Sequence, residues 1–446
     1  MKKILKNLSQ VQIIALGYAI LILFGACLLS LPVSRQPGVS PGFLDSLFTA
    51  TSSSCVTGLI TVDTATTWSF FGQAVILFLI QIGGLGFMTI ATVFFSLFRR
   101  KLGLREKAVM TESINASPIG GIAKLAKKIL FGTLCIEGAA AVILFFRFYF
   151  HYDFSAGKAI WFAVFHAVSA FCNAGFDLNG SFASFTAFSG DCTVNLVLMS
   201  LILIGGLGFL VWEDLFSNRF RLRRCSLHTK IVLLFSAILV FLPALFFFIS
   251  EYRFANSDLS VSEKVLASFF EAVTPRTAGF NTTDVAALSP AGKIMTMFLM
   301  LVGGCPGSTA GGIKTTTLAI LFFFCIGTLR RRKGVFVFGR RLYADDCIKA
   351  VLVFFLNLSI AIAGGVLILL LQPGIGLDNS LFEAFSAIGT VGMTTGITRD
   401  LGLVSRILII LMMYVGRIGS ISFGTAIMER KGEPAIQYPH EHITIG

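Results

Sequence analysis

Hydrophobic residues along this chain gather in eight long apolar runs that alternate with short polar stretches. The runs form four pairs, and a shorter, mildly amphipathic stretch separates the two members of each pair. A run of about 20 apolar residues forms a helix long enough to cross the hydrocarbon core of a bilayer. Each pair therefore predicts two membrane-spanning helices with a half-length helix between them. The first members cover about residues 11–32, 129–150, 230–250 and 350–372, and the second members about 71–98, 192–216, 292–329 and 402–428.

Two short motifs recur in the same order in all four pairs. The first motif reads SSSCVTGLIT, SAFCNAGFDL, TPRTAGFNTT and AIGTVGMTTG, centred on Gly58, Gly175, Gly279 and Gly392. The second reads IGGLGF, IGGLGF, VGGCPG and VGRIG, beginning at Ile82, Ile204, Val302 and Val415. Self-similarity of this kind is the signature of a repeat architecture. We therefore expect four tandem repeats at 1–105, 106–225, 226–340 and 341–430, followed by a C-terminal cytoplasmic tail at 431–446.

The predicted fold class is an all-α polytopic membrane protein. Each repeat contributes a helix, a pore loop and a helix around a central pore, which gives eight transmembrane helices and four re-entrant half-helices. Non-helical backbone at membrane depth is tolerated only where it is buried in protein or lines a water-filled cavity. Four loops that converge on one axis satisfy that condition. The alternative, four ordinary glycine turns, does not explain why the glycines recur at matched positions.

Composition and charge agree with a membrane protein. The chain of 446 residues is 55% hydrophobic and only 13% charged, whereas a soluble protein carries about a quarter charged residues. The net charge of +13 does not indicate nucleic-acid binding, because the basic residues form short clusters between the apolar runs, as cytoplasmic loops do. Lys2, Lys3 and Lys6 place the N-terminus on the cytoplasmic side too. The apolar stretch after them is too long for a signal peptide, so we expect a retained first helix.

No catalytic or cofactor-binding arrangement stands out in the sequence. The five histidines do not combine with a nucleophile and an orienting group, and the nine cysteines show no metal-ligand spacing. No glycine-rich phosphate loop follows a predicted strand. We therefore expect a protein that is not an enzyme and that has no covalently bound cofactor. Glu137 lies within an apolar run, but the sequence does not identify its partner.

The four matched glycines predict a cation-selectivity filter. A filter that strips water from a cation must replace it with oxygens, and backbone carbonyls supply these oxygens without a fixed charge. Glycine allows the backbone angles and close approach that this needs, and the C-terminal end of a preceding half-helix favours a cation. We expect the ion at the glycines. The predicted filter residues are Val56, Thr57, Gly58, Asn173, Ala174, Gly175, Thr277, Ala278, Gly279, Thr390, Val391 and Gly392.

Acidic residues follow the filter glycines on the expected outer side. They are Asp63, Asp177, Asp284 and Asp400. Two interpretations remain open at this stage: the carboxylates concentrate cations at the pore mouth, or they only keep the loops solvated.

The second apolar run of the third repeat predicts a gate. Residues 303–317 contain one proline and five glycines; the proline removes a helical hydrogen bond, and each glycine costs about 1 kcal/mol of helix propensity. An irregular polar segment at mid-membrane needs an aqueous cavity, so we expect a movable loop that blocks the pore. The alternative is a static kink. The predicted gate residues are Gly303, Gly304, Pro306, Gly307, Ser308, Thr309, Gly311, Gly312, Lys314 and, from the fourth repeat, Arg417.

Arg417 is the one charge among the four copies of the second motif. Its counterparts are Gly84, Gly206 and Gly304. About 16 Å of helix separates it from the cytoplasmic end, and a central arginine costs about 2.5–3.5 kcal/mol on insertion scales. We therefore expect it to face the pore as a barrier to cations, with a purely structural buried pair as the alternative.

At these motifs the chain resembles the Trk/Ktr/HKT superfamily of potassium transporters. The segments TSSSCVTGL, SAFCNAGFD, TPRTAGFNTTD and GTVGMTTGIT carry the resemblance, which covers about residues 10 to 440 and is closest to the membrane subunit of the bacterial Ktr branch. It implies a potassium-selective uptake subunit in a bacterial plasma membrane, with a loop gate and with sodium symport left open. It also implies a homodimer on a cytosolic RCK-type ring that binds adenine nucleotides. Gly58 supports potassium, because some sodium-favouring plant relatives have serine there.

Two other function classes remain to be separated from a potassium pore. The first class is the membrane sector of an ion-motive ATPase or a membrane enzyme. An ATPase sector would need an essential membrane carboxylate, for which Glu137 is a weak candidate, and it would leave the filter repeat unexplained. A sodium-selective relative would keep the same architecture with another ion.

Overall fold

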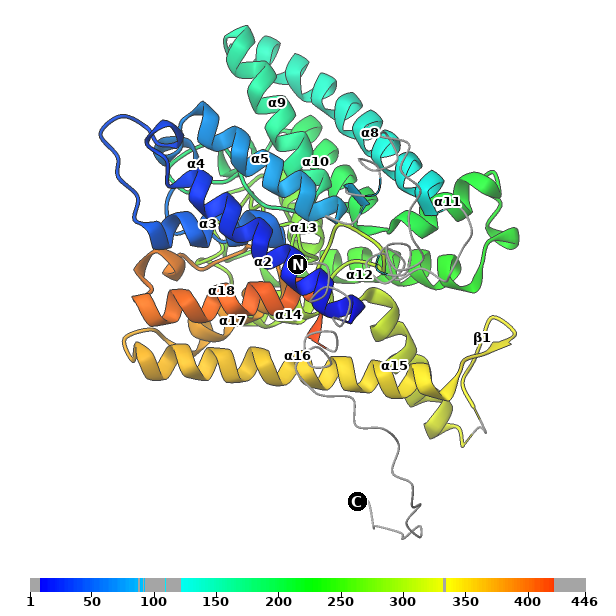
Figure 1. The fold of residues 1–446 in the computed structure, drawn as a ribbon. Helices are drawn as coiled ribbons and strands as arrows, with labels where there is room; N and C mark the ends of the chain where they lie inside the picture. The colour runs from blue at the N-terminus through cyan, green and yellow to red at the C-terminus, as the bar shows by residue number, and fades with distance from the viewer. Residues whose placement is uncertain are drawn as a thin grey trace.

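Four long apolar helices form the frame of the fold. The computed structural model describes residues 9–86, 89–90, 92, 109, 122–331 and 334–420, and Figure 1 shows that this part of the chain is mostly helical, with extended loops between the helices. Each of the four long helices is long and apolar enough to cross a membrane. They are α2 (Gln10–Leu29), α8 (Ile122–His151), α12 (Leu227–Ser250) and α16 (Ala344–Leu371).

Each long helix is followed by a half-length helix that ends at one of the repeated glycine motifs. These helices have 13 to 16 residues. The start of the third is set by a capping box, in which Ser260 and Glu263 satisfy each other's backbone N–H groups. The half-length helices are α3 (Phe43–Cys55), α9 (Ala156–Phe171), α13 (Val261–Val273) and α17 (Leu377–Gly389).

The second helices of the four repeats are shorter than the apolar runs predict. They are α5 (Phe70–Leu85), α10 (Cys192–Gly206), α14 (Pro290–Leu301) and α18 (Leu403–Ile418). Three of them end next to a glycine with positive φ, namely Gly86 at 79°, Gly208 at 91° and Gly419 at 95°. In the third repeat Pro306 occupies the equivalent place in the motif. In three repeats the helix therefore stops within the last residues of the second motif, whereas in the third repeat α14 already ends at Leu301, directly before the motif.

Two of the apolar runs contain a break. The interruption expected in the third repeat is present, because residues 302–314 separate α14 from α15 (Thr315–Leu329). The run at 192–216, which we expected to form one helix, is instead bent by 91° between α10 and α11 (Phe209–Ser217). That expectation was wrong because Gly208 adopts a backbone conformation that a helix cannot continue through.

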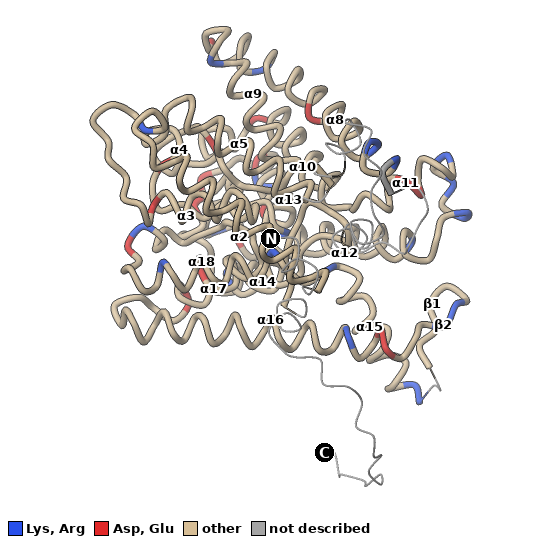
Figure 2. Tube along the Cα trace, in the orientation of Figure 1, with Lys and Arg blue, Asp and Glu red and all other residues tan. Residues whose placement is uncertain are grey.

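Short elements connect the helices. The turns of 3₁₀ helix are η1 (Pro32–Ser34), η2 (Thr186–Phe188), η3 (Leu222–Arg224) and η4 (Ile397–Asp400), and α4 (Thr64–Thr67) is a single helical turn. A hairpin of β1 (Phe336–Val337) and β2 (Arg340–Arg341) pairs Phe336 with Arg341 between α15 and α16. In Figure 2 many of the basic residues gather at the end of the molecule that carries α11 and this hairpin.

Several basic positions on which the predicted orientation depends lie outside the described residues. These are Lys2, Lys3, Lys6, the clusters at 99–101, 332–333 and 430–431, and the tail at 431–446.

The outward surfaces of the long helices are apolar. Phe131 and Phe150 on α8, Ile249 on α12 and Leu370 on α16 are each at least 70% exposed. Burying such side chains away from water is strongly favourable, so a surface of this kind belongs in lipid. The length and apolar surface of these helices identify the chain as a membrane protein.

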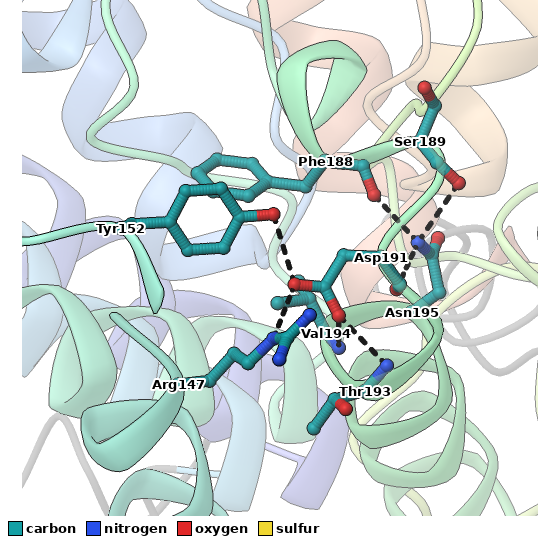
Figure 3. Close-up of polar contacts among 8 residues, drawn as sticks. All are labelled: Arg147, Tyr152, Phe188, Ser189, Asp191, Thr193, Val194 and Asn195. Carbon is teal, nitrogen blue, oxygen red and sulfur yellow. Dashed lines mark hydrogen bonds and ion pairs between the residues drawn. The ribbon is translucent and has the colours of Figure 1, made fainter. Parts of the chain in front are cut away.

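One polar cluster ties two helices together at the end of α8. The Asp191 carboxylate accepts hydrogen bonds from Arg147 Nε at 2.7 Å and from the Tyr152 hydroxyl at 2.9 Å (Figure 3). Its other oxygen caps α10 by accepting from the backbone N–H groups of Thr193 and Val194. Burial alone would raise the pKa of Asp191, but the hydrogen bonds from Arg147, Val194 and Tyr152 outweigh it and hold that pKa below its usual value.

Candidate functional site: a ring of four glycine triplets

The four predicted filter segments share one backbone conformation. In each triplet only the first and third residues have positive φ. The first residues, Val56, Asn173, Thr277 and Thr390, have φ between 52° and 74°, and the glycines that end the triplets have φ between 70° and 97°. Residues with positive φ on both sides of a residue without it interrupt the alternating peptide directions of an extended chain, so that successive carbonyl groups can face the same side. Each triplet can therefore present a short row of carbonyl oxygens.

The four triplets touch one another in a closed ring. A Cβ atom on any of the four glycines would lie within 2.7 Å of a carbonyl oxygen of the next triplet. No side chain fits at that distance, so glycine is required by space as well as by φ. The contacts run in chain order and then return to the start: Gly58 to Ala174, Gly175 to Ala278, Gly279 to Val391, and Gly392 to Thr57.

The carbonyl oxygens of the ring have no hydrogen-bond donor within the described part of the chain. The first two residues of each triplet are at most 1% exposed. Buried backbone carbonyls are almost always paired, so the eight carbonyls of these residues, unpaired within the described chain, are available to a ligand other than protein. Such a row of oxygens suits a dehydrated cation.

A hydroxyl group supports each triplet from behind. Ser52 and Ser386 accept hydrogen bonds from the backbone N–H groups of Gly58 and Gly392 at 3.0 and 3.1 Å. In the other two repeats, Ser169 and Thr274 donate to the carbonyl of the residue after the glycine. Ser52, Ser169 and Ser386 lie six residues before their glycines in the last turn of the half-length helices, whereas Thr274 lies five residues before Gly279 and follows the end of α13. They fix the position of the ring, and the sequence analysis did not single them out.

Buried or partly buried polar side chains also anchor the segment that leaves each triplet. Asp45 accepts from the Thr61 hydroxyl at 2.9 Å, and His166 Nε2 accepts from the Leu178 N–H at 3.1 Å. Two glutamates do the same in the third and fourth repeats, where Glu271 accepts from Thr283 and Glu383 accepts from Thr394 and Thr398. Three of these anchors share a feature that could have identified them in the sequence: each directly follows a phenylalanine, at Phe165, Phe270 and Phe382, and these phenylalanines are buried. Sequence reasoning missed all four anchors.

The acidic residues after the glycines have different surroundings. Asp63 caps α4 and also accepts from the Phe182 N–H, so it holds two loops together. Asp177 accepts from the Asn179 N–H within its own turn. Asp284 and Asp400 are exposed. Only the last two present largely free surface, so the four carboxylates do not form a uniform ring.

The predicted gate residues lie together beside the ring. The loop at 302–314 receives its contacts from the second repeat: Cys305 N–H donates to the Gly206 carbonyl at 2.9 Å, and Phe209 N–H donates to the Gly307 carbonyl at 2.8 Å. Thr309 Oγ1 donates to the Phe171 carbonyl at the end of α9 at 3.1 Å.

The loop also meets the fourth repeat and closes on itself. A Cβ on Gly311 would collide with the Thr390 side chain, and one on Gly312 would lie 3.1 Å from the Gly389 carbonyl. Lys314 Nζ donates to the carbonyls of Ala310 and Gly311 at 2.8 and 3.3 Å. The loop thus packs between the glycine triplets and the ends of the second helices.

Arg417 contacts the loop from the opposite side. Its guanidinium donates through Nη1 to the Thr309 carbonyl at 2.6 Å and through Nη2 to the carbonyls of Gly83 and Gly84. Its Nε donates to the Tyr18 hydroxyl at 3.3 Å. No carboxylate of the described residues forms an ion pair with Arg417. The arginine therefore joins the first, third and fourth repeats through carbonyl oxygens. The alternative, a buried ion pair, is not formed among the described residues.

The partner of Glu137 is a glutamine. Gln81 Nε2 donates to Glu137 Oε2 at 3.2 Å, and Cys172 Sγ lies 3.9 Å from Oε1. Glu137 is 4% exposed, between α8, α5 and the end of α9. Among the described residues, no group of three or more His, Cys, Asp or Glu side chains could hold a metal ion.

Comparison with known proteins places the chain in a family. A family model described as a cation transport protein, TrkH, matches residues 30–431. The chain belongs to the TrkH family. This is a family of cation transporters and not of enzymes, and the resemblance to the Trk/Ktr/HKT superfamily is confirmed.

Relatives of this TrkH-family chain include potassium uptake proteins that match it over nearly their whole length. It is 41% identical to the potassium/sodium uptake protein NtpJ of Enterococcus hirae, over 100% of this chain and 99% of that protein. It is 39% identical to the Ktr system potassium uptake protein B of Bacillus subtilis, over 98% and 96%. The solved structure of the potassium transporter TrkH from Vibrio parahaemolyticus has the same fold, with a TM-score of 0.72, 20% identity, and 92% of this chain and 84% of that one covered.

Proposed function

We propose that this chain is the potassium-selective, ion-translocating subunit of a Ktr-type potassium uptake system. The proposed architecture has eight transmembrane helices and four re-entrant half-helices. It is divided into repeats at 1–105, 106–225, 226–340 and 341–430, with a cytoplasmic tail at 431–446. Both termini lie in the cytoplasm of a bacterial cell, and the protein resides in its plasma membrane. The four long helices and the four half-length helices support this arrangement.

The closed ring of glycine triplets carries the proposal. The first two residues of each triplet are buried, the ring carbonyls have no donor among the described residues, and a Cβ on any of its glycines would meet the next triplet. In the proposed mechanism these oxygens replace the hydration shell of K⁺ as the ion passes. The hydroxyls of Ser52, Ser169, Thr274 and Ser386 keep the ring at one diameter.

The loop of the third repeat is the proposed gate. Arg417 holds it through Thr309, and Lys314 holds its own end through Ala310 and Gly311. Both cations stand beside the path and oppose the passage of a third. Opening requires the loop to leave these contacts. Because only a few hydrogen bonds are lost, the free-energy cost of opening is small enough for the loop to close again.

Sodium permeation or sodium coupling is the second candidate. It is favoured by one relative, the potassium/sodium uptake protein of Enterococcus hirae, which is 41% identical over the full chain. In that case the same ring would admit Na⁺, or Na⁺ would bind at another place during potassium uptake.

The proposed partners follow from the resemblance to the Ktr branch. They are a second copy of the chain and a cytosolic RCK-type ring that binds adenine nucleotides. The basic residues at Arg330–Arg331 and Arg340–Arg341 lie at the ends of α15 and in the hairpin, and offer the ring contacts close to the gate. The alternative for these residues is contact with anionic lipid.

Flux in liposomes tests the proposal. Purified chain should carry K⁺ in preference to Na⁺ at fixed voltage, and K⁺ flux without Na⁺ would exclude obligatory coupling. Equal K⁺ and Na⁺ flux would favour the second candidate. K⁺ flux through the chain alone should not change when ATP or ADP is added, and it should become sensitive to these nucleotides when the RCK-type ring protein is added. Nucleotide control of the isolated chain would contradict the proposed partner.

A further inference from the structure

Arg276 is a buried cation directly before the third filter triplet. It is 6% exposed, and no carboxylate of the described residues pairs with it. Leaving a charge buried without a counter-charge is costly unless polar groups surround it. The equivalent residues before the other three triplets are Cys55, Cys172 and Gly389. The charge therefore occurs only in the repeat whose second helix is interrupted by the loop.

The contacts of Arg276 lead to the base of that loop. Its Nη2 donates to Thr315 Oγ1 at 3.3 Å and lies 3.5 Å from Ser236 Oγ. Thr315 is the first residue of α15, directly after the loop. Its hydroxyl donates to the Gly303 carbonyl at 3.0 Å, and its N–H donates to the Gly304 carbonyl at 3.0 Å. Thr315 thus joins the two ends of the loop by hydrogen bonds, and Arg276 donates to the hydroxyl of Thr315.

The third triplet also touches the loop directly. A Cβ on Gly303 would lie 3.1 Å from Thr277 Cγ2, and Thr277 follows Arg276 in the chain. A cavity of about 20 Å³ lies beside these groups and is lined by Gly206, Ser236, Arg276 and Gly304, among others. A space of that size holds about one water molecule, so the guanidinium has room for a small movement without a clash.

We propose that Arg276 is a positioning residue that couples the gate loop to the third filter triplet. When the base of the loop opens, Thr315 separates from the Gly303 carbonyl, and Arg276 transmits that change to Thr277. The loop is then closed when the ring has its ion-selective shape, and the ring loses that shape when the loop opens. This inference rests on the proposed filter and gate.

Substitution of Thr315 tests the coupling in the full-length chain. Thr315→Val keeps the size of the side chain and removes the hydroxyl, so K⁺ flux in liposomes should rise about tenfold, which corresponds to about 1.4 kcal/mol at 25 °C. The preference for K⁺ over Na⁺ should fall in the same variant. Thr315→Ser, which retains the hydroxyl, should rescue both readouts. Arg276→Gln should act like Thr315→Val, and the two together should do no more than either alone.

A second background separates coupling from simple structural support. Deletion of residues 307–312 should itself raise flux, and in that background Thr315→Val and Arg276→Gln should have no further effect. If they change flux equally with and without the loop, the coupling is wrong while the gate stands. If the deletion does not raise flux, the proposed gate fails and the coupling fails with it.

Discussion

The guanidinium of Arg417 donates to the carbonyl oxygen of Thr309 at 2.6 Å and so joins the last helix of the fourth repeat to the loop of the third. The same side chain reaches the carbonyls of Gly83 and Gly84, close to the C-terminal end of α5. That end carries a partial negative charge, which favours the arginine there. One residue thereby holds three repeats around the loop without any carboxylate.

Replacing Arg417 should open the proposed gate. A hydrogen bond from a charged group contributes about 1.5–3 kcal/mol, so Arg417→Ala should raise K⁺ flux in liposomes by about tenfold or more. Arg417→Lys keeps the charge but cannot bridge several carbonyls, and should give an intermediate flux. If both variants fold and both conduct less than the parent, Arg417 does not hold a gate closed.

The hydroxyl of Ser52 should matter for selectivity more than for folding. It accepts the N–H of Gly58, and loss of such a bond is worth about 1 kcal/mol. Ser52→Ala should therefore lower the K⁺ to Na⁺ preference about fivefold. Ser54 is the matched control, because it is buried on the same helix and its hydroxyl has no partner among the described residues. Equal losses of selectivity in Ser52→Ala and Ser54→Ala would count against a specific support.

Glu137 should prove structural. Its carboxylate is bound by Gln81 between helices, and Glu137→Gln retains a hydrogen-bonding group of the same length. We expect this variant to keep K⁺ flux within about twofold, whereas Glu137→Leu should lower stability by about 1–3 kcal/mol because Gln81 loses its partner. Thermal unfolding in detergent measures the second effect. If Glu137→Gln is stable but loses transport completely, Glu137 is not only structural, and the hypothesis that it is an essential membrane carboxylate is supported.

Asp191 should stabilise the fold in a pH-dependent way. Its pKa is lowered in the folded protein, so its contribution is present above the unfolded pKa of about 3.9 and disappears as the pH falls through the folded pKa. Asp191→Asn loses the ion pair with the partly exposed Arg147, about 1 kcal/mol. Asp191→Ala also loses the cap of α10, about 1 kcal/mol more. The difference in unfolding temperature between parent and Asp191→Asn should be constant from about pH 8 to 5 and shrink below about pH 4; a difference that grows on acidification would contradict this.

The sequence predicted the features that depend on local chemistry and on repetition. The four long helices follow from apolar length, and the interruption in the third repeat follows from Pro306 and its neighbouring glycines. The glycines of the four triplets were identifiable because the motif occurs four times. Their left-handed φ values agree with the backbone freedom inferred for them.

Features that depend on contacts between repeats were not predictable from the sequence. Gly208 breaks the run at a positive φ, and a Cβ there would lie 2.5 Å from the Pro306 carbonyl, a contact that exists only once the third repeat is in place. The partner of Glu137 is 56 residues away in the chain. Arg276 stands inside a recognised motif, but its importance depends on Thr315, 39 residues further on. Local patterns carry no information about such pairings.

The central claim is that the ring of four triplets binds the transported ion through its carbonyl oxygens. Crystals grown with Tl⁺, a heavy ion of the charge and approximate size of K⁺, test this directly by anomalous diffraction. We predict an anomalous peak on the axis of the ring, beside Gly58, Gly175, Gly279 and Gly392, which weakens when K⁺ is added in excess. Tl⁺ bound elsewhere, with no peak inside the ring at a concentration that the protein transports, would contradict the account.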